Sequence, residues 1–260
     1  MANIEQVLRL IGKDVIDDVE LYINDAKSRD YLNFNSEEEI NLFFKGFMKD
    51  VYNNHSYDEI DNIRYYTGIS FNSINSLLRG YWDYDKNGLL TEEKKEEIIE
   101  ISSEIEESLI NMPNLNSNIK AYRGVDINYF RDYDIHSLDD LNKLVNQYYF
   151  DSGFISTSLL QETSFFDKDL EYHDKCNIEI EYLIPEECSE AIPLINDDLS
   201  YSKSQNEFLI CKSSLSKIVD VNVDSDENKA YISMLYIPQK IWNKDLNKER
   251  NSIKKWLSFI

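Results

Sequence analysis

Residues 119–125 read IKAYRGV, and they mark the point where the sequence pattern changes from helical to extended. Before this stretch, apolar residues recur at intervals of three and four, the spacing of amphipathic helices. After it, short apolar segments follow one another, and several alternate with a period of two. Helices first and strands afterwards, without regular βαβ alternation, predict an α+β protein.

Helices are predicted throughout the N-terminal part. The first covers residues 4–23, and the second begins at Ser36, which forms a capping box with Glu39. A shorter helix is expected over about 70–79, and a further one begins after Thr91. The first helix packs on the body or serves as a docking element for another protein.

Strands are predicted in the second part, interrupted by one helix from Ser137 to about Tyr148. The predicted strands are IKAYRGV, GFISTS, CNIEIEYLIP, EAIPLI, EFLIC, KIVDVNV and AYISMLYIP. No internal repeat or low-complexity linker is present, so we predict a single domain. Its expected parts are a helical segment (1–118), a β-rich segment (119–238) and a basic amphipathic C-terminal helix (239–260).

The composition excludes several classes of protein. Apolar residues make up 42% and charged residues 29% of the chain, as in soluble globular proteins. The net charge of −22 argues against general binding to nucleic acid, because phosphate backbones attract clustered Lys and Arg. No apolar run approaches the roughly 18 residues of a transmembrane helix. The first residues lack the basic and apolar regions of a secretory signal.

The acidic charge is uneven, because residues 240–260 contain six Lys or Arg and two acids. Their apolar residues are near helical spacing. Two interpretations are open for this helix. It packs on the body of the protein and balances its charge, or it contacts a partner or a membrane surface.

No metal site is predicted. The three histidines are scattered and no Cys-x-x-Cys motif occurs, so the three cysteines are expected to be buried, reduced thiols. Residues 83–94, DYDKNGLLTEEK, resemble a calcium-binding loop at their first, third, fifth and sixth positions. The twelfth position is Lys94, where such a loop needs a glutamate, so a turn leading into the helix cap at Thr91 is the preferred interpretation.

Three polar motifs accompany the predicted strands, in a fixed order. AYRGVD places Arg123 at the end of a strand, GFISTSL places Ser156 in the next one, and QNEFLI places Gln205 and Glu207 just before a buried strand. Phosphate-binding glycine loops (GxGxxG, GxxxxGK[ST]) and the GxSxG nucleophile motif are absent. Each of the three polar motifs is unspecific alone, and their order carries the information.

Together these motifs resemble the R-S-E class of mono-ADP-ribosyltransferases. Residues 63–80, IRYYTGISFNSINSLLRG, are similar to the Tyr-Thr-Gly to Leu-Arg segment of clostridial and bacillary ADP-ribosylating toxins. These include the enzymatic component of iota toxin, insecticidal binary toxins and Rho-inactivating exoenzymes. Residues 177–195 resemble the passage between their serine and glutamate motifs, and the similarity spans about 35–240. It implies helices packed on a two-sheet mixed β core around a cleft for NAD.

The resemblance also implies a role for each matching residue. Glu207 would stabilise the positive charge that builds on the ribose when the bond to nicotinamide breaks. Arg123 would contact the NAD phosphates, the Gly124 backbone would hold the nicotinamide amide, and Ser156 would orient Glu207. Further NAD contacts are expected from Tyr66, Phe71, Asn75, Phe165 or Phe166, and Lys168.

The resemblance further addresses the acceptor. Arginine-modifying members carry Glu-x-Glu, whereas Gln205 provides a neutral amide that can pair with an Asn or Gln side chain. Transfer to Asn or Gln of a Rho-like GTPase is therefore predicted, with Tyr201 or Ser202 touching the acceptor protein. The strong acidity departs from the Rho-modifying relatives. The alternatives are transfer to actin, hydrolysis of NAD by water, and an inactive NAD-fold adaptor.

The resemblance implies a toxin that acts in the cytosol of a target cell. The expected routes of delivery are unconventional secretion, transport by a separate binding component, and injection, with use inside the producing cell as the alternative.

Overall fold

A computed structural model describes residues 13–67, 71–80, 84–85, 88–110, 112–164, 176–195 and 206–242 of the 260-residue chain. The helices of this described part are α2 (Lys13–Ala26), α3 (Glu37–Asn54), α4 (Tyr57–Tyr65), α5 (Phe71–Leu78), α6 (Glu92–Leu109) and α7 (Gln239–Trp242). Short 3₁₀ helices are η2 (Ile127–Tyr133), η3 (Asp139–Leu144) and η4 (Gln161–Thr163).

The helix caps follow local sequence chemistry, and one of them was not predicted. Ser36 caps α3 as expected, accepting from the Glu39 backbone N–H at 3.2 Å. The Glu39 carboxylate accepts from the N–H of Asn35 rather than from that of Ser36, at 2.8 Å. Helix α4 was missed, although Ser56 and Glu59 form a complete capping box at its start.

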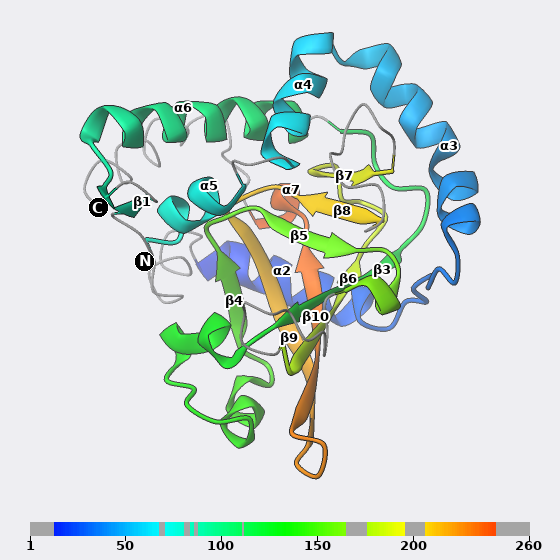
Figure 1. Cartoon of the computed structure of the whole chain (residues 1–260). Helices are drawn as coiled ribbons and strands as arrows, with labels where there is room; N and C mark the ends of the chain where they lie inside the picture. The colour runs from blue at the N-terminus through cyan, green and yellow to red at the C-terminus, as the bar shows by residue number, and fades with distance from the viewer. Residues whose placement is uncertain are drawn as a thin grey trace.

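The strands form one eight-stranded sheet in the order β4-β9-β10-β6-β3-β5-β8-β7 (Figure 1). All neighbouring pairs are antiparallel except β10 and β6. The bounds are β3 (Ile119–Val125), β4 (Tyr148–Asp151), β5 (Ile155–Ser158), β6 (Ile178–Ile184), β7 (Ala191–Leu194), β8 (Glu207–Ile210), β9 (Ser214–Asp224) and β10 (Lys229–Ile237). A separate two-stranded sheet pairs β1 (Tyr84–Asp85) with β2 (Gly88–Leu89).

The contact between β3 and β5 is short, a single registered pair of Tyr122 with Ser158. Five strands on one side and three on the other therefore meet at a narrow junction, which corresponds to the two-sheet core implied by the resemblance. The α+β class and this architecture are confirmed.

One region differs from the prediction, the helix expected from Ser137 to Tyr148. The chain there forms the short 3₁₀ helix η3, and Tyr148 already belongs to strand β4. Strand β4 has four residues and is bonded only to β9, at the edge of the sheet. So short an edge strand has too little alternation to be recognised from its sequence.

Two hydrophobic clusters hold helices against the sheet. Helices α3 to α6 lie on one side of the β5-β8-β7 end, where Phe44 of α3 meets Phe208 of β8 with ring centroids 6.2 Å apart (Figure 1). A smaller cluster joins Val19 and Ile23 of α2 to Leu235 of β10 and its neighbours. The sheet is thereby covered at different places by the N-terminal helix and by the helices that follow.

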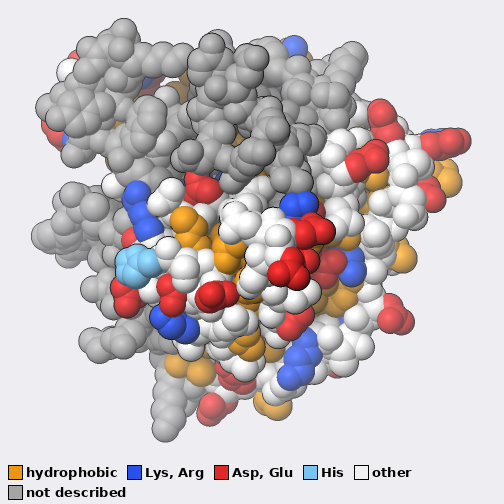
Figure 2. Space-filling view, turned by 60° about the horizontal axis from the view of Figure 1, so that its bottom comes forward, with side chains coloured by type: hydrophobic (Ala, Val, Ile, Leu, Met, Phe, Trp, Pro, Cys, Tyr) orange, Lys and Arg blue, Asp and Glu red, His pale blue; other side chains and the backbone are white. Residues whose placement is uncertain are grey.

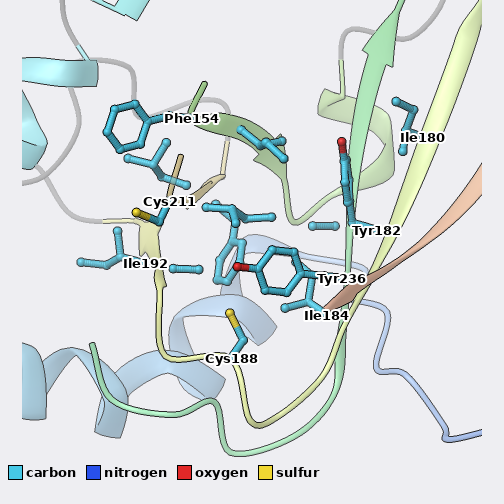
Figure 3. Close-up of a cluster of buried hydrophobic side chains, with 14 of the residues drawn as sticks. Phe154, Ile180, Tyr182, Ile184, Cys188, Ile192, Cys211 and Tyr236 are labelled. Atoms are coloured by element: carbon cyan, nitrogen blue, oxygen red, sulfur yellow. The ribbon is translucent and has the colours of Figure 1, made fainter. Parts of the chain in front are cut away.

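The cysteines are reduced as expected from the sequence, and the expected burial is found for two of the three. All three are free, and Cys188 and Cys211 are buried, whereas Cys176 is half-buried. Figure 3 shows Cys188 and Cys211 among buried side chains such as Ile192 and Tyr236. Burial raises the pKa of both buried thiols well above its ordinary value, which makes them unreactive core residues.

Acidic and basic side chains are interspersed on the face shown in Figure 2, which presents the lower edge of the molecule in Figure 1. No helix among the described residues has the length and apolar character needed to cross a membrane. The described residues also contain no group of three or more His, Cys, Asp or Glu arranged to hold a metal.

Several predicted features fall wholly or partly outside the described residues. They include residues 4–12 of the predicted first helix, the C-terminal helix beyond residue 242, and Asp83 and Asn87 of the calcium-like loop. The predicted cap of the following helix is confirmed, because Thr91 Oγ1 accepts from the Lys94 backbone N–H at 3.2 Å.

The Phe44–Phe208 contact leads to a stability prediction. Phe44 is fully buried, so Phe44→Ala should lower the free energy of unfolding by about 3–5 kcal/mol through lost burial and a cavity. Leu42, two residues earlier in α3, is 74% exposed, and Leu42→Ala should change it by less than about 0.5 kcal/mol. Urea unfolding measures both, and equal losses would contradict this account of the core.

Candidate functional site

Three neighbouring strands bring the three polar motifs together. Strand β5 lies between β3 and β8, so Arg123, Ser156 and Glu207 come from adjacent strands although they are far apart in the sequence. Residues 156 and 158 share a face of β5, and Ser158 is registered with Glu207. Ser156 is therefore a diagonal neighbour of Glu207 and reaches its carboxylate across the strand boundary.

Glu207 is the buried carboxylate of this site. It is 8% exposed, and Ser156 Oγ donates a short hydrogen bond to its Oε1. Burial raises the pKa of Glu207 above its ordinary value, and the Ser156 bond and the Arg123 charge reduce the shift without cancelling it. A carboxylate held this way has a defined direction and a strong local field, because little water screens it.

Arg123 is the cation whose charge acts on this carboxylate. Its Nη1 donates to the backbone oxygen of Ser156 over 3.4 Å, and its guanidinium lies 5.3 Å from the centre of the Tyr129 ring. No carboxylate of the described residues forms an ion pair with it. Its charge therefore remains available to an anionic ligand.

The helical half contributes Tyr66 and Asn75 to the same region. Asn75 Nδ2 donates to the Tyr66 hydroxyl at 2.7 Å, and Asn75 Oδ1 accepts from the Phe154 backbone N–H at 2.8 Å. Burial raises the pKa of Tyr66, and the charges of Glu207, Arg79 and Arg123 also act on it. Helix α5 is thus joined to the segment that leads into β5.

Two further predicted NAD contacts, Phe71 and Gly124, lie within the described residues. Phe71 begins α5, and 41% of its surface is exposed. The Gly124 backbone N–H already donates to the Ser164 oxygen at 2.7 Å. A nicotinamide amide would have to use the carbonyl of Gly124 or displace this bond.

The remaining predicted residues, Phe165, Phe166, Lys168, Tyr201, Ser202 and Gln205, lie outside the described part of the chain. Strand β8 begins only at Glu207, and Asn206 has φ of 44°, in the left-handed region that asparagine tolerates. The predicted shared face of Gln205 and Glu207 stays a prediction, because Gln205 lies outside the described residues.

An ion pair that the sequence did not reveal lies near Asn75 and Arg123. Arg79, one residue beyond α5, donates Nε to Asp151 Oδ1 at 2.8 Å and Nη2 to Oδ2 at 2.9 Å. Tyr129 donates its hydroxyl to Oδ2 at 2.9 Å. The only sequence signals were the Arg at the end of SINSLLRG and the Asp before GFISTS, and neither indicates the pairing.

A further link anchors strand β8 to the helical half. Lys212 follows the strand and is 5% exposed. Its Nζ donates to Ser102 Oγ at 3.0 Å and lies 3.3 Å from Glu106 Oε2, both on α6. The strand that begins with Glu207 is therefore tied to a helix at its other end.

The close packing at Gly153 leads to a second prediction. A Cβ there would lie 2.8 Å from Asn75 Oδ1 and 3.0 Å from Arg79 Cζ, and both side chains are held by hydrogen bonds. Gly153→Ala should therefore cost about 1–3 kcal/mol of unfolding free energy. Gly46→Ala, in α3 with nothing within 4 Å of the new atom, should be stabilising by up to about 1 kcal/mol. If Gly153→Ala left the free energy of unfolding unchanged, the prediction would be wrong, because Asn75 and Arg79 would then have moved aside at no cost.

The raised pKa of Glu207 leads to a third prediction. Folding favours the protonated form, so the contribution of Glu207 to stability falls as the pH rises from the ordinary pKa of 4.5 through the raised value. Glu207→Gln, which keeps the shape without charge, should be more stable than wild type at pH 7. The difference should vanish below about pH 4, where both are neutral. Urea unfolding between these values tests this, and a difference independent of pH would contradict it.

Comparison with known proteins identifies the family. Residues 41–237 match the family model of the ADP-ribosyltransferase exoenzymes. No curated protein matches the chain by sequence. Among solved structures, exoenzyme C3stau2 from S. aureus with NAD has a TM-score of 0.62 at 17% identity, covering 81% of this chain and 100% of the other.

Two other toxins show the same fold. The Clostridium limosum C3 exoenzyme has a TM-score of 0.59 at 20% identity, covering 81% of this chain and 98% of its own. BECa of the C. perfringens binary enterotoxin, with NADH, has 0.57 at 19%, covering 80% of this chain and 50% of its own. The family match spans most of the chain, and so the protein belongs to the ADP-ribosyltransferase exoenzymes, NAD⁺–protein mono-ADP-ribosyltransferases of the bacterial toxin class.

Proposed function

We propose that this enzyme transfers ADP-ribose from NAD to an asparagine or glutamine side chain of a Rho-like small GTPase. The observation that carries the proposal is the buried Glu207 carboxylate, oriented by Ser156 and flanked by Arg123. NAD joins a cationic nicotinamide riboside to an anionic diphosphate. A carboxylate beside an arginine that has no carboxylate partner in the described part of the chain suits a ligand with this pattern of charge.

In the proposed reaction, the bond between nicotinamide and ribose breaks and positive charge develops on the ribose. Glu207 stabilises that charge, since the carboxylate is prearranged in a poorly hydrated site. Ser156 keeps the carboxylate in position, and Arg123 holds the diphosphate. Tyr66 and Asn75 support the cleft from the helical side.

The acceptor residue is proposed from Gln205. A glutamine amide both donates and accepts hydrogen bonds, so it matches the amide of Asn or Gln, whereas it cannot deprotonate a guanidinium. C3-type exoenzymes are among the structural neighbours, which fits this choice. Tyr201 and Ser202 are proposed to contact the acceptor protein.

Actin is the second candidate target, because the neighbours also include the enzymatic subunit of a binary enterotoxin. Hydrolysis of NAD by water and an inactive adaptor role are two further candidate functions. Action in the cytosol of a target cell, after secretion or injection and with or without a separate binding component, is part of the proposal.

The fourth prediction concerns transfer to protein, and it is tested with labelled NAD in a target-cell lysate. Wild type should label a protein of small-GTPase size, and Glu207→Gln should lower the rate about 10²- to 10³-fold, while NAD affinity remains nearly unchanged. Labelling of a band of actin size instead would move the target to the second candidate.

Gln205→Glu and hydroxylamine treatment test the acceptor chemistry in the same experiment. The bond made by wild type should resist neutral hydroxylamine, which cleaves arginine linkages, and Gln205→Glu should lose the amide acceptor. A hydroxylamine-sensitive wild-type product would overturn the role of Gln205. Release of nicotinamide without any labelled protein would favour hydrolysis, and neither product would overturn the enzyme assignment to this chain.

A further inference from the structure

We propose that Asp151 is a positioning residue of this enzyme, which holds both arginines of the cleft in place for an anionic dinucleotide. The inference rests on the proposed function of the site. It concerns a residue that contacts neither Glu207 nor Ser156 and that acts through Arg79 and Tyr129.

Asp151 is the last residue of β4 and is 3% exposed. Its carboxylate accepts four hydrogen bonds, two from Arg79, one from the Tyr129 hydroxyl and one from the Gly153 backbone N–H. These donors come from the helical half, from η2 and from the turn that leads to β5. The carboxylate therefore joins three separate parts of the chain at one point.

The bonds to Arg79 fix the orientation of its guanidinium. Nε and Nη2 both face Asp151, and Nη2 also donates to the Phe154 backbone oxygen at 3.0 Å. A guanidinium has five N–H groups in one plane, so three are used and their plane is set. The two on Nη1 have no hydrogen-bond partner in the described part of the chain.

Tyr129 carries the same constraint to Arg123. Its hydroxyl is held by Asp151, and its ring lies 5.3 Å from the Arg123 guanidinium and stacks on Tyr149 at 5.2 Å. A ring fixed at both its edge and its face gives Arg123 a rigid surface to rest on. One carboxylate thus positions one guanidinium directly and the second through an aromatic ring.

The charges around Asp151 also fit this positioning role. Burial alone would raise the pKa of Asp151, but the charge and bonds of Arg79, the Arg123 charge and the Gly153 N–H together lower it. The carboxylate is therefore ionised at neutral pH, and it offsets one of two nearby positive charges. The remaining positive charge can meet a diphosphate without the repulsion that two uncompensated arginines would have.

The test distinguishes binding of the ADP-ribose part of NAD from binding of its nicotinamide part. For Asp151→Asn, nicotinamide release from NAD is measured with ADP-ribose or nicotinamide as competing inhibitors. The inhibition constant of ADP-ribose and the KM for NAD should rise at least about tenfold, with the constant for nicotinamide and kcat within about twofold to threefold. A purely structural role would raise both inhibition constants or lower kcat through loss of folded protein.

Glu187→Gln is the matched control. Arg29 Nη1 lies 2.8 Å from both Glu187 oxygens, and Tyr22 also donates to this carboxylate, so a carboxylate, an arginine and a tyrosine also meet here, outside the Glu207 site. This variant should leave both inhibition constants unchanged. Tyr129→Phe, which keeps the ring and removes the hydroxyl, covers the case in which Asp151→Asn does not fold, and it should raise the ADP-ribose constant about threefold.

Three outcomes would overturn the inference. Unchanged ADP-ribose inhibition in an active Asp151→Asn or Tyr129→Phe variant removes the role of Asp151 alone. Equal rises for ADP-ribose and nicotinamide make the residue structural. A wild-type protein that neither releases nicotinamide nor binds ADP-ribose overturns the proposed function, and this inference falls with it.

Discussion

The hydrogen bond between Ser156 and Glu207 is the interaction on which the site depends. A carboxylate that is 8% exposed is costly in its ionised form, and it is retained here because a hydroxyl and a nearby guanidinium partly compensate it. That compensation exists only if β5 lies between β3 and β8. The strand order is therefore a requirement of the chemistry. The single registered pair between β3 and β5 places the strand of Arg123 next to the strand of Ser156.

Around this bond, the two arginines of the site have different kinds of partner. Asp151 is matched to Arg79, whereas Arg123 rests on a ring and a backbone oxygen. Such an arrangement separates the two tasks of an arginine in a buried place, support of the fold and contact with a ligand. The family to which the chain belongs uses NAD⁺ as substrate, which agrees with a site that combines a buried anion with a partly unmatched cation.

Local signals made much of the fold predictable. The strand from Ile119 to Val125 coincides with its predicted range, and Ser36 and Thr91 cap helices as expected, because alternation and capping depend on neighbouring residues. Strand β4 escaped prediction, since a four-residue edge strand is defined by its pairing with β9 and not by its own pattern.

The residues of the site likewise include some that the sequence made predictable and some that it did not. Arg123, Ser156 and Glu207 could be named because each lies in a short motif and the motifs keep their order. The pairing of Arg79 with Asp151 could not, because 72 residues separate them and nothing in either segment specifies the other. The left-handed conformation of Asn206 is likewise a property of the folded chain, and it limits what strand alternation can say about Gln205.

The hydrogen bonds that join the Phe154 backbone to Asn75 and Arg79 have a consequence for how the site forms. Asn75 and Phe154 are 79 positions apart, and they meet only when the helical and β-rich halves have docked. Neither half can complete the site by itself, because these bonds need residues of both. Formation of the site therefore reports that the two halves of the chain have docked.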